Sequence, residues 1–89
     1  MKLTYNFIHM DSSAALIEFA SERLNRMDKF ELKPLEVRFS FSMRKHQKMC
    51  DILIAGSRNR FQASSSGEDI YAVVEDALEK LEHQLQRRK

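Results

Sequence analysis

The chain has 89 residues, which is enough for one domain and leaves no room for a second hydrophobic core. Two glycines and one proline exclude a loop-rich or collagen-like chain, and regularly spaced apolar residues argue against disorder. The net charge of +2 points to no partner by itself, so the positions of the cations matter instead. No apolar run approaches the ~18 residues that cross a bilayer, no signal peptide is evident, and the single Cys50 excludes an internal disulfide. We therefore expect a cytoplasmic protein with no membrane partner.

The first part of the chain predicts a strand and then a helix. Leu3, Tyr5 and Phe7 alternate with polar residues, which is the period of a half-buried strand. From about residue 13 to residue 28, apolar residues recur at helical spacing. Pro34 ends this region, because proline disfavours helix in the residue before it.

Three further strands follow. The clearest of them has five alternating apolar residues, Leu35, Val37, Phe39, Phe41 and Met43. In the next strand Cys50, Ile52 and Ile54 alternate. Gly56-Ser57 suits a tight hairpin turn in which glycine adopts a positive φ. A weaker strand is expected from Arg58 to Ser64.

A closing helix completes the predicted fold. Ser66 is its expected N-cap, with Glu68 and Asp69 offsetting the positive end of the helix dipole. The order is therefore β-α-β-β-β-α, an α+β domain that occupies residues 1–89 without a C-terminal extension. The first two strands are joined through a helix and should be parallel, and the rest should be antiparallel. Both helices should cover one face of this four-stranded sheet.

Acids and bases are segregated around the predicted helices. At about 100° per residue, Lys80, His83 and Arg87 form a basic stripe along one flank of the last helix. The acids of this helix gather on its far side, at Glu68, Glu75, Glu79 and Glu82. A second basic ridge on the first helix consists of Arg23, Arg26 and Lys29. If both helices pack on one sheet face, the two ridges would line a shared positive groove suited to phosphates.

These charges also suit plainer roles. A solvated helix face held by pairs such as Glu22–Arg26 accounts for the ridges, and the stem of Arg23 can lie across an apolar edge. The basic connection around Lys45 suits either a phosphate backbone or an ordinary charged loop.

The sheet face away from the helices should be polar, with Thr4, Asn6, Arg38, Ser40, Ser42, Arg60 and Gln62. This face lacks the aromatic pairs on which sheet-based modules stack bases, because the aromatic residues of the strands take the inward parity. The pattern favours recognition of a nucleic-acid backbone and its shape.

Catalytic and metal sites have little support in the sequence. Cys50 and Asp51 point to opposite sides of a strand, and nothing orients a base against the thiol. We interpret Cys50 as a buried structural residue. The three histidines lack the spacing of metal ligands, and no phosphate-binding glycine loop is present. We expect no enzyme activity, cofactor or metal.

Two segments carry a resemblance to a known family. The first is Gly67-Glu68-Asp69-Ile70-Tyr71-Ala72, followed by Lys80-Leu81, Gln84-Leu85 and the basic end. The second runs from Ala15-Leu16 through Glu18-Phe19, Arg23 and Arg26 to Met27. Over essentially its whole length, the sequence resembles the short ribosome hibernation promoting factors, relatives of the ribosome-associated inhibitor and sigma-54 modulation proteins.

This resemblance implies a domain that binds the small ribosomal subunit and its ribosomal RNA in the channel between head and body. There it would obstruct the mRNA and tRNA positions and silence translation in slow growth or stationary phase. Short forms of this kind favour ribosome dimers and generally need a separate ribosome modulation factor for pairing. Off the ribosome we expect a monomer.

The resemblance also implies which residues contact RNA. Family cations fall at Arg23, Arg26, Lys80, Arg87 and Lys89. To these the basic ridges add Lys29 and His83, and the basic end of the chain adds Arg88. The basic connection offers Arg44, Lys45 and Lys48 as additional contacts.

The chain departs from the family pattern in two respects. His83 stands where members often have arginine, and the last helix has an unusual number of acids, at Glu75, Glu79 and Glu82. Two alternatives stay open. One is a general double-stranded RNA module, which also places helices on one face of a small sheet. The other is a protein–protein adaptor that has lost RNA binding, which the acidic stripe suggests.

Overall fold

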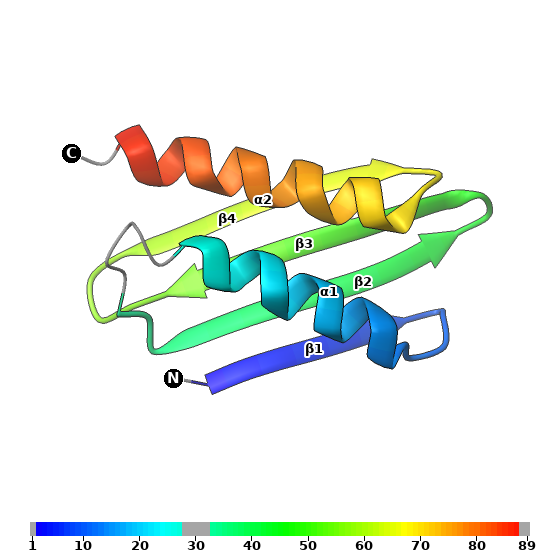
Figure 1. Cartoon of the computed structure of the whole chain (residues 1–89), viewed down its shortest axis with the longest axis horizontal. Coiled ribbons are helices and arrows are strands. Elements are labelled where there is room, and N and C mark those ends of the chain that lie inside the picture. The colour runs from blue at the N-terminus through cyan, green and yellow to red at the C-terminus, as the bar shows by residue number, and fades with distance from the viewer. Residues whose placement is uncertain (1, 28–32, 88–89) are drawn as a thin grey trace.

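The computed structural model describes residues 2–27 and 33–87. Its elements are β1 (Lys2–Ile8), α1 (Ala14–Asn25), β2 (Glu36–Arg44), β3 (Gln47–Ala55), β4 (Arg60–Gly67) and α2 (Ile70–Arg87). The strands form one sheet in the order β1-β2-β3-β4, with β1 parallel to β2 and the other neighbours antiparallel (Figure 1). The predicted order and strand directions are confirmed.

The core lies between the sheet and both helices. Phe39 of β2 is opposite Tyr5 on one side and Ile52 on the other, so the apolar residues of neighbouring strands line up in rows. The rings of Tyr5 and Phe39 stack with their centroids 5.4 Å apart. Leu16 of α1 and Leu81 of α2 belong to the same buried cluster. Both helices therefore cover one face of the sheet, as Figure 1 also shows.

The ends of α1 follow ordinary capping chemistry. The Ser13 hydroxyl accepts a hydrogen bond from the Leu16 N–H at 3.1 Å, so this helix begins where the sequence predicts. Arg23 lies in its last turn, where a cation is favourable for the helix dipole.

The predicted start of α2 is wrong. Ser66 lies within β4, opposite Met49 of β3, and cannot cap a helix that begins at Ile70. Asp69 acts as the cap: its carboxylate accepts the Tyr71 N–H at 3.0 Å, and its carbonyl accepts the Val73 N–H at 2.9 Å. The reason is that β3 is long enough to pair with the serines and Gly67, which extends β4 beyond Ser64.

The predicted conformation of Gly56 is also wrong. Neither glycine of the chain has a positive φ, and the turn between β3 and β4 is closed by a hydrogen bond from the Gly56 N–H to the Asn59 carbonyl at 2.8 Å. The turn therefore spans four residues and does not need the left-handed conformation. In the described segments, positive φ occurs at His9 (58°) and at Lys45 (59°), which lies in the tight β2–β3 turn.

The open face of the sheet is mostly polar, as expected, although Ile8, Met49 and Leu53 also lie on it. One row across it contains Thr4, Arg38, Leu53 and Gln62, and the next contains Asn6, Ser40, Asp51 and Ser64. Its charges are partly matched, since Arg38 lies 2.8 Å from Glu36 and Gln62 donates to Asp51 at 3.1 Å. No described aromatic residue of a strand lies on this face.

Removing the carboxylate of Asp69 should destabilise the fold. For Asp69→Ala we expect a loss of about 1 kcal/mol in the free energy of unfolding, because the first turn of α2 loses its cap. Urea titration followed by circular dichroism measures this change. Ser66→Ala is the matched control and should be near neutral; a larger loss there than at Asp69 would contradict the assigned cap.

Candidate nucleic-acid interface

A groove of mixed charge runs between α1 and α2. It is lined by Arg23, Arg26, Met27, Glu75, Leu78, Glu79 and Glu82. The Arg23 Nε donates to Glu75 Oε1 at 2.9 Å, and its guanidinium lies 4.5 Å from the centroid of the Phe19 ring. Arg26 lies 3.7 Å from Glu22 of its own helix. The first basic ridge thus faces the acidic stripe of α2.

The second basic ridge lies on the opposite flank of α2, beside β4. Lys80 Nζ donates to the Ser64 carbonyl at 3.2 Å and lies 3.4 Å from the Asp76 carboxylate. His83 and Arg87 are exposed, and neither forms an ion pair with any other described residue.

The predicted shared positive groove is therefore wrong for the described residues. The rotation of α2 is set by burial of its apolar side, which includes Val74 and Leu81. With that side against the sheet, the glutamates turn toward α1 and Lys80 turns toward the sheet edge. The two basic ridges end up on either side of an acidic band.

The surroundings of Asp76 favour its ionised form. The Ser65 hydroxyl donates to its carboxylate at 2.5 Å, and this hydrogen bond, with the nearby Lys80 ammonium, lowers the pKa of the Asp76 carboxyl. Because the carboxylate accepts from both β4 and Lys80, it positions the ammonium along the edge of the sheet.

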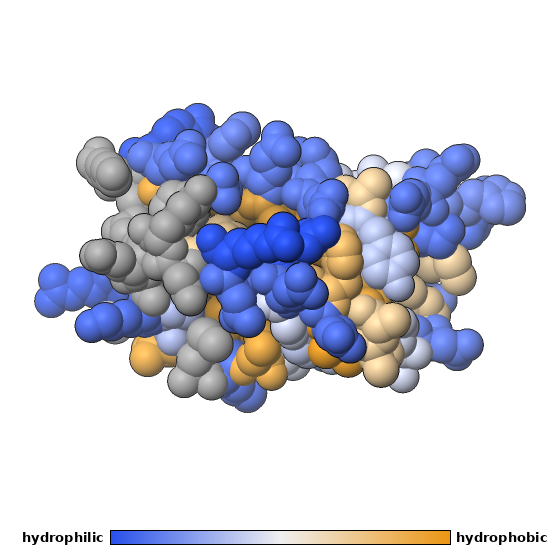
Figure 2. Space-filling view, in the orientation of Figure 1, coloured by the Kyte–Doolittle hydropathy of each residue, from blue (hydrophilic) through white to orange (hydrophobic). Residues whose placement is uncertain are grey.

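A third cationic surface lies at the β2–β3 turn. Arg44 and Lys45 are exposed there and make no ion pair within the described part of the chain. Lys48 is half-buried and donates to the Glu68 carbonyl at 2.8 Å. Figure 2 shows hydrophilic side chains gathered at this end of the molecule and along α2. The remaining predicted contacts, Lys29, Arg88 and Lys89, lie outside the described residues.

Sequence reasoning missed an aromatic pair that joins α1 to α2. The rings of Phe19 and Tyr71 meet edge to face with centroids 4.9 Å apart, and Tyr71 is 40% exposed. The i,i+4 spacing of Phe19 and Arg23 was the available sign that the guanidinium would lie over a ring.

The match to known families decides the classification. Residues 3–89 match the family described as "Sigma 54 modulation protein / S30EA ribosomal protein". The chain belongs to this family. Its resemblance to the sigma-54 modulation and hibernation proteins is thereby confirmed, and the family is one of ribosome-associated proteins.

Two solved structures are similar to this S30EA family member. The N-terminal domain of Protein Y from Thermus thermophilus is 18% identical, with a TM-score of 0.86 and 100% of each chain covered. A ribosomal subunit interface protein from Coxiella burnetii is 23% identical, with a TM-score of 0.76 and 94% of each chain covered. At these identities the likeness establishes the fold. A search of curated proteins found no match.

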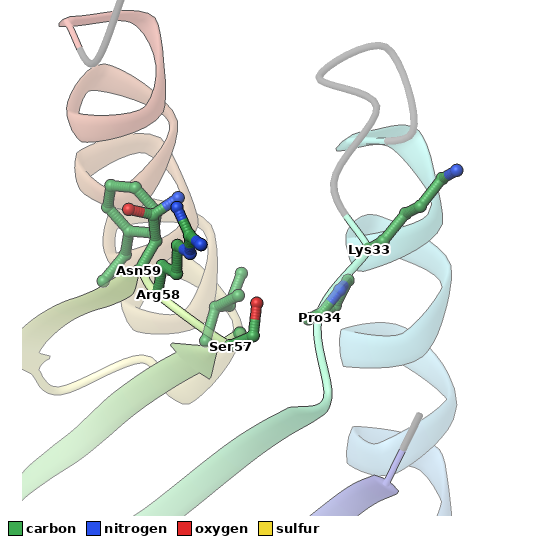
Figure 3. Close-up of a pocket in the computed structure, with 8 residues that line it drawn as sticks. Lys33, Pro34, Ser57, Arg58 and Asn59 are labelled. Atoms are coloured by element: carbon green, nitrogen blue, oxygen red, sulfur yellow. The ribbon is translucent and has the colours of Figure 1, made fainter.

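Another hollow of the S30EA-family chain lies between the β3–β4 turn and the segment before β2. Figure 3 shows Arg58 and Asn59 close together on the turn, whereas the Lys33 side chain extends away from them. Pro34 and Phe61 supply part of its apolar lining. The polar groups do not converge on one point, so the hollow is not built like a ligand site.

Cys50 lacks the features of a nucleophile. Its side chain is fully buried, and burial, assisted by the charge of Asp51, raises the pKa of the thiol to about 12. The interpretation as a buried structural cysteine is confirmed. No group of three potential metal ligands occurs among residues 2–27 and 33–87, and no helix there is long and apolar enough to cross a membrane.

The thiol of Cys50 should resist modification in the native protein. At mildly alkaline pH, Ellman's reagent should react with it only after denaturant is added, because the folded state keeps the thiol protonated and covered. The absorbance of the released thiolate measures the reaction. A rapid reaction without denaturant would show that the pocket around Cys50 opens readily.

The Arg23–Glu75 pair should contribute little to stability. A double-mutant cycle with Arg23→Ala and Glu75→Ala should give a coupling below about 1 kcal/mol, because Glu75 is half exposed and water competes for both charges. Urea titrations of the four proteins provide the coupling. A value above about 2 kcal/mol would instead mean that Arg23 is committed to its partner.

Proposed function

We propose that this chain is a ribosome hibernation factor of the cytoplasm. It binds the small ribosomal subunit in the mRNA and tRNA channel and silences translation in slow growth or stationary phase. The observation that carries this proposal is the family match over residues 3–89 on a fold whose helix side exposes cations. Like the short forms that its sequence resembles, it favours ribosome dimers with a separate modulation factor.

Ribosomal RNA is the proposed contact, through the phosphates. Arg87 and the turn cations Arg44 and Lys45 have no carboxylate partner among the described residues and are free to meet an anion. His83 is also exposed. Cations placed in this way release counterions from RNA and give affinity that does not depend on base sequence.

The ion pairs on the helices do not prevent this role. Arg26 and Lys80 lie 3.7 Å and 3.4 Å from their carboxylates, and both pairs are more than half exposed. Exposed pairs of this kind are worth only about 0–1 kcal/mol, so a polyphosphate chain can displace the carboxylates. Arg23 has the shorter contact, and it keeps its guanidinium over Phe19 while doing so.

The open face of the sheet argues against recognition of RNA by base stacking. It offers hydroxyls and amides such as Thr4, Asn6 and Ser40 but no described aromatic ring on which a base could stack. A chemical reaction is not part of the proposal, since no described group is arranged as an activated nucleophile or a metal ligand set.

Reversal of the helix cations should abolish binding to small subunits. The variant Arg23→Glu, Arg26→Glu, Lys80→Glu, Arg87→Glu places repulsive charge where phosphates would lie, and co-sedimentation with purified small subunits measures the loss. The matched control carries Lys2→Glu, Arg38→Glu, Arg58→Glu and Arg60→Glu on strands and turns. Both variants move the formal net charge from +2 to −6, since each of four substitutions replaces +1 with −1.

The two variants separate position from total charge. The proposal expects binding to be lost in the helix variant and retained in the control. Retained binding in the helix variant would overturn the assigned contacts, and equal loss in both would mean that only net charge matters. For four phosphate contacts the slope of log K against log salt should be about −3 to −4 for the unmodified chain.

The acidic band supports a second candidate, a protein–protein adaptor that does not bind RNA. Glu75, Glu79 and Glu82 together outnumber the two arginines in the inter-helix groove. A protein partner retained at high salt, with no ribosome association, would select the adaptor. Competition by plain duplex RNA as strong as competition by ribosomes would instead indicate a general double-stranded RNA module.

A further inference from the structure

The two edges of the sheet differ in how they are protected. Along β4, Lys80 Nζ donates to the Ser64 carbonyl at 3.2 Å and Gln84 Nε2 donates to the Gln62 carbonyl at 2.6 Å. Side chains of α2 thus occupy two acceptors that an incoming strand would need. Such cover is one way in which proteins prevent pairing at an edge strand.

The β1 edge has no such cover among the described residues. The Lys2 N–H donates to the Leu35 carbonyl, so even-numbered residues of β1 direct their backbone groups toward β2. Leu3, Tyr5 and Phe7 therefore direct three N–H and three C=O groups outward. No described side chain bonds to these groups, since the one hydrogen bond of a β1 side chain joins the hydroxyls of Tyr5 and Ser21.

The composition of β1 also lacks the usual protection of an edge. It is seven residues long, has no proline, and carries Lys2 as its one charged residue. Leu3 is 39% exposed and Ile8 is 46% exposed, while Tyr5 and Phe7 are half-buried. A long edge with apolar side chains and free backbone groups is a template for another strand.

We propose that β1 pairs in antiparallel fashion with β1 of a second copy of this chain, centred on Tyr5. In this register Leu3 lies opposite Phe7 of the second copy, and Tyr5 lies opposite its own equivalent, so apolar side chains meet on the core face. On the open face Thr4 lies opposite Asn6, and Lys2 lies opposite Ile8. No like charges face each other, which is the condition for favourable cross-strand pairs.

The geometry closes at two copies. An antiparallel pair about Tyr5 is isologous, and both β1 edges are used up by it. The outer edges of the resulting eight-stranded sheet are the two β4 strands, which Lys80 and Gln84 cover. A dimer is therefore expected rather than a filament.

The helices are compatible with this arrangement. The twofold axis is perpendicular to the sheet, so both helix layers lie on the same face. In Figure 1, α1 crosses the sheet obliquely, with its N-terminal end in front of β1 and its C-terminal end farther from that edge. The twofold axis therefore places the N-terminal end of α1 in one copy beside the C-terminal end of α1 in the other copy, which lies farther from the shared edge.

This inference revises the expectation of a monomer. One seven-residue edge is small compared with stable interfaces, so the dimer should form only as concentration rises. It does not rest on the proposed function, because the residues that pair are not the cations assigned to RNA.

A charge test distinguishes this register from others. Thr4→Lys with Asn6→Lys places two like-charged pairs across the interface, whereas Thr4→Lys with Asn6→Glu places two opposite-charged pairs there. Sedimentation equilibrium from micromolar to millimolar protein should give a dimer about tenfold weaker than the unmodified chain for the first variant. The second should be at least as strong as the unmodified chain. Ser64→Lys with Ser66→Lys, on the covered β4 edge, is the control and should dimerise normally.

Cross-linking gives an independent measurement. Positions 4 and 6 form a pair without mutual hydrogen bonds in this register, with Cα atoms about 4.5 Å apart, which a disulfide can span. A mixture of Thr4→Cys and Asn6→Cys chains should form a mixed disulfide under mild oxidation, and either variant alone should form much less. The buried Cys50 should not compete.

The proposal would be overturned by an unmodified chain that stays monomeric at millimolar concentration. Equal dimerisation of both charge variants, or a filament in place of a dimer, would overturn the register and the closure. Thermal unfolding followed by circular dichroism verifies that each variant is folded, so a loss of pairing cannot be a loss of structure.

Discussion

The burial of one face of the sheet against both helices determines most of what this molecule presents to solvent. Phe39 and Phe41 are completely buried, and Leu16 of α1 and Leu81 of α2 close over them. Since apolar burial is the dominant favourable term in folding, each helix must turn its apolar side to the sheet. The directions in which the charged flanks of the helices point are then fixed as well. The alternation of acids and bases across the helix layer follows from packing beneath it.

That constraint explains why the basic residues do not form one continuous surface. The glutamates of α2 lie between the cations of α1 and those beside β4. Arg23 is therefore already paired with Glu75 in the free protein. Such ion pairs are weak when exposed, so they reduce the positive potential that an RNA backbone would meet without abolishing it. If the proposed function holds, the affinity of this domain for RNA should therefore depend markedly on salt.

Much of the fold was predictable because strand and helix periods are local. The alternation of Phe39, Phe41 and Ile52 is enough to predict which face of the sheet is buried, and the helix between β1 and β2 favours a parallel pair. The capping of α2 was not predictable in the same way, since Ser66 and Asp69 both have suitable side chains. Which one caps depends on how far β4 pairs with β3. The contacts of Lys80 could not be predicted either, because a helical wheel gives the angular order of the charges but not which flank of the helix contacts a neighbouring element.

The protection of the sheet edges could not be predicted from local sequence either. Nothing in the local sequence of β4 marks it as protected, since its cover comes from Lys80 and Gln84 on a different element. β1 looks like any half-buried strand, yet the parallel connection leaves it outermost with Tyr5 at its middle. Lys80, which points away from the inter-helix groove, is thus one of the two side chains that shield β4. The rotation of α2 therefore divides the basic residues into two ridges, and among the described residues it covers the β4 edge but not the β1 edge.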